Sequence, residues 1–216
     1  MKIGIDIMGG DFAPKKTIEG AVLALEHFHK DEKLFLFGQE KKITSELNKY
    51  DFNNDLIEII DCSEIIEMGE HPTKAFKNKI DSSIYKGFEY LAENQIDTFA
   101  SAGNTGAIFI GGYYSVKPIR GVIRPSIATV LPKPNGKVAV LLDVGANADC
   151  KADVLYQFGI LGSLYAQNVY DIKDPKVSLL NLGEEKTKGN MLTQTAYSLM
   201  HGSKDYNFIG NIEANN

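Results

Sequence analysis

The stretch Lys2-Ile3-Gly4-Ile5-Asp6-Ile7-Met8-Gly9-Gly10-Asp11, directly after Met1, decides the fold class. Its first six residues are rich in isoleucine, which favours a β-strand. The two adjacent glycines then allow a tight turn. Pro14 suits the first position of a helix, and apolar residues recur at helical spacing from Ile18 to Phe28. A strand, a glycine turn and an amphipathic helix are the first half of a βαβ unit.

The same alternation continues along the chain. Further apolar residues repeat at helical spacing in 84–91 and again in 154–165. The strand-like runs are Lys2–Ile7, Lys33–Phe37, Leu56–Asp61, Asp97–Ser101, Ile127–Leu131, Lys137–Asp143, Val177–Asn181 and Asn207–Asn211. Strands alternating with helices predict an α/β fold with a doubly wound, mostly parallel sheet.

One connection departs from this pattern. Pro132-Lys133-Pro134-Asn135-Gly136-Lys137 joins two apolar runs, and Asn-Gly between strands is a strong signal for an antiparallel hairpin. No linker-like stretch divides the chain, so we expect a single α/β domain over residues 1–216. Because no covering helix follows the strand-like run Tyr206–Glu213, we expect that domain to lack its C-terminal part.

Composition narrows the function. The chain has 216 residues, 44% of them apolar and 24% charged, which is ordinary for a globular protein. A net charge of −5 argues against a nucleic-acid partner. Cys62 and Cys150 are too few for a disulfide framework and are expected to be reduced thiols. The N-terminus has no leader-like pattern. The longest apolar run (107–116) is shorter than the about 20 residues that a membrane span needs, so we expect a cytoplasmic protein.

Small and polar residues follow the strands, where ligands bind in open parallel sheets. Gly9 and Gly10 follow the first strand and would let the backbone approach a ligand closely. The alternative is that they form an ordinary turn between strand and helix. Ser101-Ala102-Gly103-Asn104-Thr105-Gly106-Ala107 follows the fourth, and its backbone N–H groups at a helix start would make an anion cradle. The alternative for this loop is a helix cap with glycines for close packing.

Two later loops are also polar. Asp143-Val144-Gly145-Ala146-Asn147-Ala148-Asp149-Cys150-Lys151 follows the hairpin, and Asp149 there is also suited to capping the next helix. Lys188-Gly189-Asn190 offers a cation and an amide to an anion. No histidine or metal-ligand spacing accompanies them, so no metal is expected. Dinucleotide, P-loop, zinc-protease and serine-hydrolase motifs do not occur, and no cofactor is expected.

Read together, these loops resemble the PlsX-type phosphate acyltransferases of bacterial phospholipid synthesis. The matching stretches run in family order: Asp6-Ile7-Met8-Gly9-Gly10-Asp11, Asp81-Ser82-Ser83, Ser101 to Ala107, Arg124-Pro125, Leu142 to Lys151, Gln157-Phe158, Leu180 to Glu185, Lys188-Gly189-Asn190 and Asn207 to Asn211. The resemblance implies transfer of a fatty acyl group from acyl carrier protein to inorganic phosphate. It also implies a fold like isocitrate/isopropylmalate dehydrogenases and phosphotransacetylases, a homodimer, and a membrane acyltransferase that uses the acyl phosphate.

The chain departs from the resembled family in two ways. Family members are about half as long again and carry an Asp-Gly-Phe-x-Gly-Asn motif that this chain lacks. Their peripheral contact with the inner face of the membrane is expected to lie in that C-terminal part. The family's basic run before Asp-Ser-Ser is reduced here to Lys77-Asn78-Lys79-Ile80.

These considerations assign roles to individual residues, as a hypothesis. Phosphate would bind Ser101, Gly103, Asn104, Thr105 and Gly106. The catalytic groups would be Lys188, Asn190 and Asn147. The loops would be oriented by Asp6, Gly9, Gly10, Asp11, Asp143 and Asp149. Carrier protein would dock on Lys77, Lys79, Arg120 and Arg124.

Two rival functions stay open. A nicotinamide-dependent decarboxylating dehydrogenase of the same fold would need metal-binding carboxylates and an arginine cluster, and the chain has only Arg120 and Arg124. The other rival is an inactive fragment, or a module of the same fold that only binds carrier protein.

Overall fold

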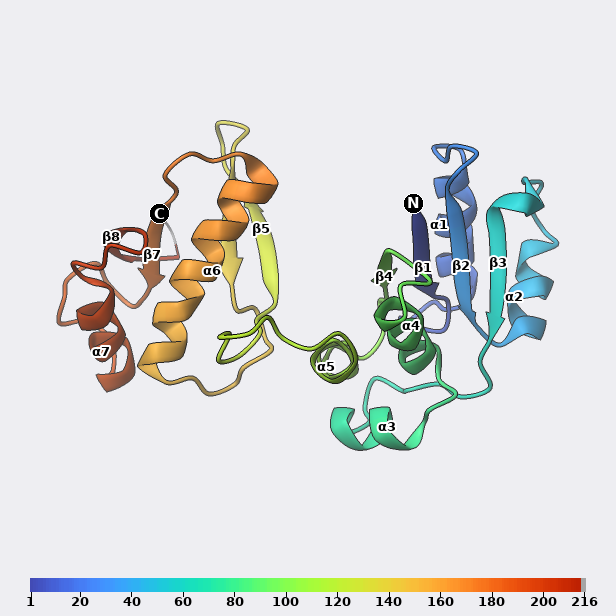
Figure 1. Ribbon diagram of the computed structural model, residues 1–216, viewed down its shortest axis with the longest axis horizontal. Helices are drawn as coiled ribbons and strands as arrows, with labels where there is room; N and C mark the ends of the chain where they lie inside the picture. The colour runs from blue at the N-terminus through green and yellow to red at the C-terminus, as the bar shows by residue number, and fades with distance from the viewer. Residues whose placement is uncertain (215–216) are drawn as a thin grey trace. The chain divides into compact units, whose positions relative to one another are not determined.

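The computed structural model describes residues 1–214, in two compact units, Met1–Pro118 (unit 1) and Ile119–Asn216 (unit 2). Each unit alternates strands with helices, which confirms the α/β class (Figure 1). Each unit is described separately below, and the expectation of a single domain over residues 1–216 stays a prediction.

Unit 1 is built on a four-stranded sheet in the order β3-β2-β1-β4, with every neighbouring pair parallel. Its strands are β1 (Lys2–Asp6), β2 (Lys33–Gly38), β3 (Ile57–Asp61) and β4 (Thr98–Ala100). Its helices are α1 (Lys15–Leu25), α2 (Glu40–Leu47), α3 (Pro72–Asn78), α4 (Ser83–Ala92) and α5 (Thr105–Gly111), with short helical turns at Asn54–Leu56 and Gly112–Val116. Pro14 stands one residue before α1, within the usual uncertainty of a helix start.

Strand β2 shows why the sheet of unit 1 is covered on both faces. Its residues are apolar at successive positions, and successive side chains point to opposite faces. Leu34 and Leu36 pack with α1 and α2, whereas Phe35 and Phe37 pack with Tyr90 of α4 on the other face. Figure 1 shows α1 and α2 behind the sheet and α4 in front of it. The doubly wound arrangement expected from the sequence is therefore present in unit 1.

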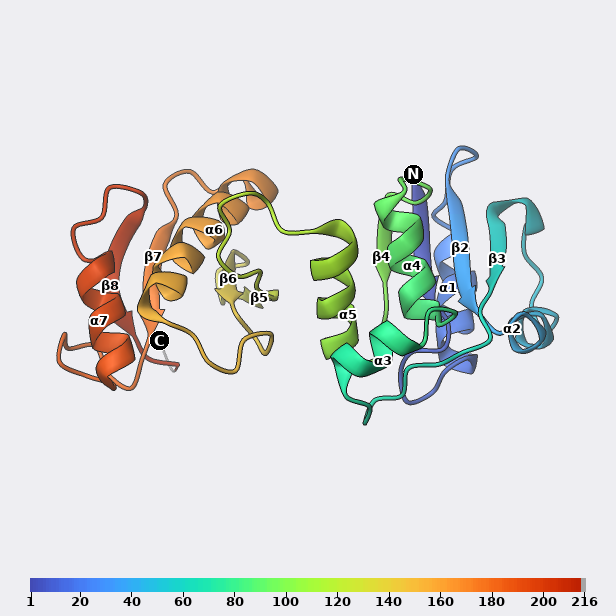
Figure 2. The same cartoon turned by 60° about the horizontal axis from the view of Figure 1, so that its bottom comes forward.

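Helix α5 stands beside α4 and contacts α3, which lies below α4 (Figure 2). The close approach of α3 and α5 depends on Gly106, where an added Cβ would lie 2.3 Å from Cγ of Pro72. The packing fixes where α5 begins, and therefore where the loop after β4 presents its backbone.

Unit 2 contains the predicted hairpin. Strands β5 (Ala128–Pro132) and β6 (Val138–Leu142) pair antiparallel around the turn at Asn135-Gly136, with Gly136 at a positive φ of 76°. The hairpin forms a two-stranded sheet of its own among the described residues, and does not interrupt the parallel sheet of unit 1. Strands β7 (Lys176–Leu180) and β8 (Asn207–Ile212) form a second, parallel pair.

Two helices complete unit 2, α6 (Ala152–Tyr170) and α7 (Met191–Met200). The buried face of α6 is rotated from the one expected, because Tyr165 is 40% exposed while Gly159, Ser163 and Ala166 face inward. The small residues allow a close approach: a Cβ on Gly159 would lie 2.7 Å from Cζ of Tyr206. Within residues 1–214, no helix has the length and apolar character to span a membrane.

Candidate functional site

The loops after β1 and β4 are tied together by Asp6. This carboxylate is 1% exposed and accepts hydrogen bonds from Met8 N at 3.0 Å and from Ser101 Oγ at 2.7 Å. Ser101 Oγ in turn accepts the N–H of Gly103 at 3.0 Å. Asp6 therefore links the two loops, and the orienting role assigned to it stays a prediction. The Ser101 hydroxyl, assigned to phosphate, is engaged between the two loops.

The same two loops touch at their glycines. A Cβ on Gly9 would lie 2.5 Å from Oδ2 of Asp6 and 2.6 Å from the backbone N of Gly103. Gly10 has a positive φ of 98°, a conformation that favours glycine. Asp11 follows as an exposed residue of the turn. The glycine pair therefore allows both the turn and the contact between loops.

Asn104 is used within unit 1. It precedes α5, and its Oδ1 accepts the N–H of Ala107 at 3.0 Å. Its Nδ2 donates to the carbonyls of Glu67, Met68 and Glu70 at 3.0 to 3.2 Å, and the residue is 4% exposed. The side chain thus caps the helix and holds the 67–70 turn, so the loop offers an anion mainly its backbone N–H groups and the exposed Thr105.

Gly106 is explained by the close packing of α5 against Pro72, which is the alternative that the sequence left open. The cap and the close contact are both present, and neither excludes a ligand at the exposed side of the loop. The sequence alone could not separate these roles, because Pro72 and Glu67 lie more than thirty residues earlier in the chain.

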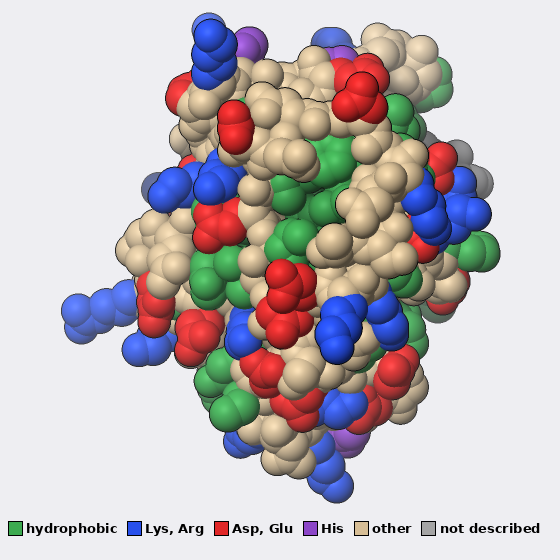
Figure 3. Space-filling view, turned by 90° about the vertical axis from the view of Figure 1, so that its right-hand side faces the viewer, with side chains coloured by type: hydrophobic (Ala, Val, Ile, Leu, Met, Phe, Trp, Pro, Cys, Tyr) green, Lys and Arg blue, Asp and Glu red, His purple; other side chains and the backbone are tan. Residues whose placement is uncertain are grey.

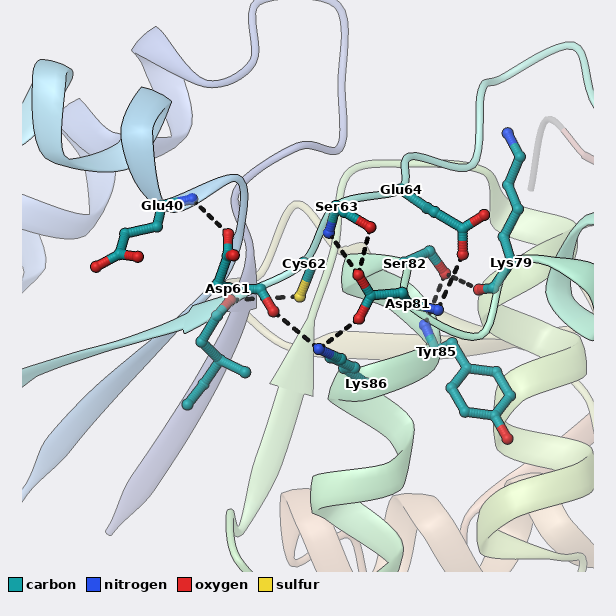
Figure 4. A network of polar contacts seen from close by, with 11 residues as sticks. Glu40, Asp61, Cys62, Ser63, Glu64, Lys79, Asp81, Ser82, Tyr85 and Lys86 are labelled. Carbon is teal, nitrogen blue, oxygen red and sulfur yellow. Dashed lines mark hydrogen bonds and ion pairs between the residues drawn. The ribbon is translucent and has the colours of Figure 1, made fainter.

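A polar network that the sequence reasoning did not single out lies where β3 ends and α4 begins (Figure 4). Asp81 accepts the N–H of Ser63 at 2.9 Å and also the Ser63 hydroxyl, and it pairs with Nζ of Lys86 at 2.5 Å. Lys86 also donates to the carbonyl of Asp61 at 2.9 Å. The hydrogen bonds from Lys86 and Ser63 lower the pKa of Asp81 to about 2. The Asp81-Ser82-Ser83 motif was the available signal.

The cysteines are poorly suited to attack a thioester. Burial raises the pKa of Cys62 to about 12, and the residue is fully buried. The pKa of Cys150 is also raised, by burial first and then by the nearby charge of Asp143. A thiol with a raised pKa is protonated at neutral pH and is a weak nucleophile.

The basic residues of unit 1 assigned to carrier protein are partly engaged elsewhere. Lys79 Nζ donates to the carbonyl of Ile65 and to Oε2 of Glu70, each at 2.6 Å, and this bond lowers the pKa of Glu70. Lys77 Nζ lies 5.5 Å from the ring centroid of Tyr114. Figure 3 shows acidic and basic side chains interspersed on the end of unit 1 that carries α2 and β3.

In unit 2, Asp143 organises the loop after β6. Its carboxylate accepts the backbone N–H groups of Ala146 at 3.0 Å, Asn147 at 2.8 Å and Ile127 at 3.3 Å. The Asn147 side chain donates to the carbonyl of Pro125 at 2.9 Å. Asp143 thus holds the loop after β6, while the Nδ2 of Asn147 is bonded to the segment before β5; the roles assigned to both residues stay predictions.

The neighbouring residues of this loop differ from expectation at one point. Asp149 does not cap α6, whose N-cap residue is Lys151 without a side-chain cap; instead, the Asp149 carbonyl accepts a hydrogen bond from Arg124 at 2.8 Å. Arg124 thus braces the loop, and Arg120 is exposed. The cap prediction for Asp149 was wrong because two residues, Cys150 and Lys151, lie between it and the first helical residue, Ala152.

The loop between β7 and α7 carries the remaining catalytic candidates. Asn190 is the N-cap of α7, and its side chain accepts the N–H of Thr193 at 3.0 Å. Lys188 is half-exposed, and its Nζ lies 3.7 Å from Oε2 of Glu185. Asn181 Nδ2 donates to the carbonyl of Lys188 at 3.3 Å, which ties the loop back to β7. An exposed ion pair of this length is weak, so Lys188 is able to exchange Glu185 for an anionic ligand.

The chain is similar in sequence to known proteins. A family model described as "Fatty acid synthesis protein" matches residues 1–216. The chain is 48% identical over 214 residues to a phosphate acyltransferase from Halothermothrix orenii and 43% identical over 213 residues to one from Dictyoglomus turgidum. These alignments cover 99% of the chain but 64% and 63% of the relatives. The chain thus spans less than two thirds of the length of the curated relatives it matches.

Solved structures show a similar fold. A phosphotransacetylase from Streptococcus pyogenes matches with a TM-score of 0.71 at 19% identity, over 99% of this chain and 68% of that one. A branched-chain phosphotransacylase from Enterococcus faecalis matches with a TM-score of 0.65 at 16% identity, with the same coverage. These likenesses confirm the fold class, while the expected likeness to dehydrogenases stays a prediction.

Proposed function

Because the chain belongs to the fatty acid synthesis protein family, we propose that it carries out transfer of a fatty acyl group from acyl carrier protein to inorganic phosphate. The observation that carries the proposal is the 43–48% identity to proteins named phosphate acyltransferase, in alignments that cover 99% of the chain. The proposed products are an acyl phosphate and free carrier-protein thiol.

The chemistry needs positioning more than an activated side chain. A phosphate oxygen attacks the carbonyl carbon of the thioester, the carbon–sulfur bond breaks, and the leaving thiolate takes up a proton. Phosphate is an anionic nucleophile at neutral pH, and a thioester is an activated donor. The protein therefore has to align the two and stabilise the oxyanion. The raised pKa values of both cysteines favour this direct route over an acyl-cysteine intermediate.

Unit 1 is suited to phosphate. We assign the anion to the backbone N–H groups of residues 103–106 and to the Thr105 hydroxyl at the start of α5. The Asp6–Ser101 hydrogen bond supports this assignment, since it holds the loop in place. The Gly103 N–H donates to Ser101 Oγ, so the anion is assigned mainly to the N–H groups of residues 104–106. The side chains of Ser101 and Asn104 then act as positioning groups.

Unit 2 supplies the groups proposed for charge and for hydrogen bonding. Lys188 is assigned to neutralise phosphate or oxyanion charge, and its weak pairing with Glu185 supports that role. Asn190 and Asn147 are assigned further hydrogen bonds to the reacting groups. They would use the donors and acceptors that are not engaged in their contacts with Thr193 and Pro125. Asp143 keeps the Asn147 loop in place.

The proposed partners follow the same reaction. Acyl carrier protein would dock on Lys77, Arg120 and Arg124, with Lys79 required to release Glu70 before it contributes. A membrane acyltransferase would consume the acyl phosphate. Homodimerisation and peripheral contact with the inner face of the membrane are proposed for the longer protein.

Phosphate-dependent release of carrier-protein thiol tests the function. The purified chain is incubated with acyl carrier protein carrying a palmitoyl group, with and without phosphate, and the thiol is quantified. The Halothermothrix orenii relative serves as the positive control. Release that rises with phosphate supports transfer. Binding of the acyl carrier protein without any turnover would instead indicate the carrier-binding module, which the chain's 63–64% coverage of its relatives keeps as the second candidate.

A further inference from the structure

Unit 2 contains a cavity of about 600 Å³ between two strands that do not pair with each other. Residues 138–143, which include β6, line one side and residues 174–180, which include β7, line the other. Helix α6 packs on both strands (Figure 1), and its Phe158, Gly159 and Gly162 also line the cavity. A βαβ connection normally joins parallel strands of one sheet, yet β6 and β7 share no ladder among residues 1–214.

Among residues 1–214, no strand pairs with the edge of β6 that faces away from β5. In an antiparallel pair, residues that exchange backbone hydrogen bonds alternate with residues whose N–H and C=O point outward. The N–H of Lys133 bonds the carbonyl of Lys137 at 2.8 Å, which places Ala139 and Leu141 among the bonded positions. The backbone groups of Val140 therefore point away from β5, on the side of the cavity.

The edge of β7 that faces away from β8 is also unpaired among residues 1–214. In a parallel pair, alternate residues direct both backbone groups to the same neighbour. The N–H of Asn181 bonds the carbonyl of Ile212 at 2.9 Å, so Leu179 also faces β8. Ser178 and Leu180 then direct their backbone groups away from β8. Two unpaired edges thus border one cavity.

The composition of β6 also indicates a strand with neighbours on both sides. Val138-Ala139-Val140-Leu141-Leu142 is apolar throughout, as in central strands that are buried on both faces. Here all five residues are only half-buried. Unpaired apolar edges invite pairing with another strand.

An extended strand suits the cavity better than a helix does. Paired strands lie about 4.8 Å apart, so one inserted strand bridges edges roughly 10 Å apart and satisfies both rows of backbone groups. A helix is about 10–12 Å wide and has no free backbone groups to offer these edges. The cavity lining includes the charged residues Lys133, Asp143, Asp174 and Lys176 and is otherwise mainly apolar.

We propose that this cavity receives a β-strand from the part of the longer relatives that lies outside the matched region, joining β5-β6 and β7-β8 into one sheet of five strands. The length supports this occupant, because more than a third of each relative lies outside the match, and the solved phosphotransacylases also extend beyond it. The inserted strand makes unit 2 a single sheet and positions the loops of Asp143 and Lys188 at its strand ends.

A chimera tests the proposal directly. The part of the Halothermothrix orenii relative that lies outside its match is joined to the chain, and amide hydrogen exchange is compared with that of the chain alone. We expect exchange at Val140 and Ser178 to slow by about 100-fold or more, as for amides that gain a stable backbone bond. Ala139 and Leu179 are the internal controls, because their amides are already bonded to β5 and β8. Unchanged exchange at Val140 and Ser178 overturns the proposal.

A substitution pair provides an independent measurement. Ser178→Pro removes one cavity-facing N–H and leaves the bonds to β8 intact, whereas Ser178→Ala keeps that N–H. We expect Ser178→Pro to lower the Tm of the chimera much more than that of the chain alone, and Ser178→Ala to affect both alike. Equal effects of Ser178→Pro on the chimera and on the chain would contradict an inserted strand.

Discussion

Substituting Gly9 with alanine tests the contact between the two loops that carry the proposed phosphate site. The added Cβ would lie 2.5 Å from Oδ2 of Asp6 and 2.6 Å from N of Gly103. Real contacts of this kind are not shorter than about 3.0 Å, so the loops must separate by about 0.5 Å or more. That movement lengthens the 2.7 Å hydrogen bond from Ser101 to Asp6. The backbone angles of Gly9 are not in the left-handed region, so the effect is steric.

The expected loss of stability follows from these contacts. Overpacking a tight site costs about 1–3 kcal/mol, and weakening a hydrogen bond to a buried carboxylate adds to it. We expect Gly9→Ala to reduce the free energy of unfolding by about 2–3 kcal/mol, which lowers Tm by roughly 5 °C or more for a chain of this size. Thermal unfolding followed by circular dichroism measures the shift.

Gly20→Ala is the matched control. Gly20 is exposed within α1, and an added Cβ there meets nothing within 4 Å. Alanine is the better helix former by about 1 kcal/mol, so this variant should unfold at a slightly higher temperature. The reasoning is refuted if Gly9→Ala unfolds within about 1 °C of the unsubstituted chain while Gly20→Ala behaves as expected.

Three further changes test other parts of the molecule. Lys188→Ala should lower phosphate-dependent thiol release by about 100-fold if its charge stabilises the oxyanion, with Lys186→Ala of the same loop as control; a loss of only a few-fold would remove Lys188 from the reaction. Asp143→Ala leaves three backbone amides without their acceptor and should lower the free energy of unfolding by about 2 kcal/mol in urea titrations; a change under about 0.5 kcal/mol would show that water replaces the carboxylate. Because Lys86 and the serine beside it lower the pKa of Asp81 from 3.8 to about 2, its contribution is complete above about pH 4 and is lost as the pH falls through 2. The Asp81 side chain is 39% exposed, which limits that contribution to under about 1 kcal/mol. Asp81→Asn should make the free energy of unfolding less dependent on pH between about pH 4 and 2, and an unaltered pH dependence would contradict the pairing.

Most of the secondary structure was predictable because its causes are local. The alternation of apolar runs and amphipathic stretches placed all eight strands within one residue of their observed ends, and Asn135-Gly136 placed the hairpin turn. The residues that follow the strands were likewise identified as the loops of interest, since parallel strands direct their carboxyl ends to one edge. The buried face of α6 was less predictable. Gly159 lies on that face because it packs closely against Tyr206, which is distant in the sequence.

What each polar side chain does within its loop was decided by the tertiary structure. Asp6 and Ser101 are 95 residues apart, and Asn104 meets carbonyls that precede it by 34 to 37 residues. No sequence spacing specifies such partners, because they depend on which strands become neighbours and how closely their helices pack. The sequence therefore determined the elements, the turn and the loops that could hold an anion. Only the tertiary structure showed that the side chains of Ser101, Asn104 and Lys79 are hydrogen-bonded within the protein. Their partners are distant in sequence, and a side chain that is already bonded to such a partner is less available to a ligand.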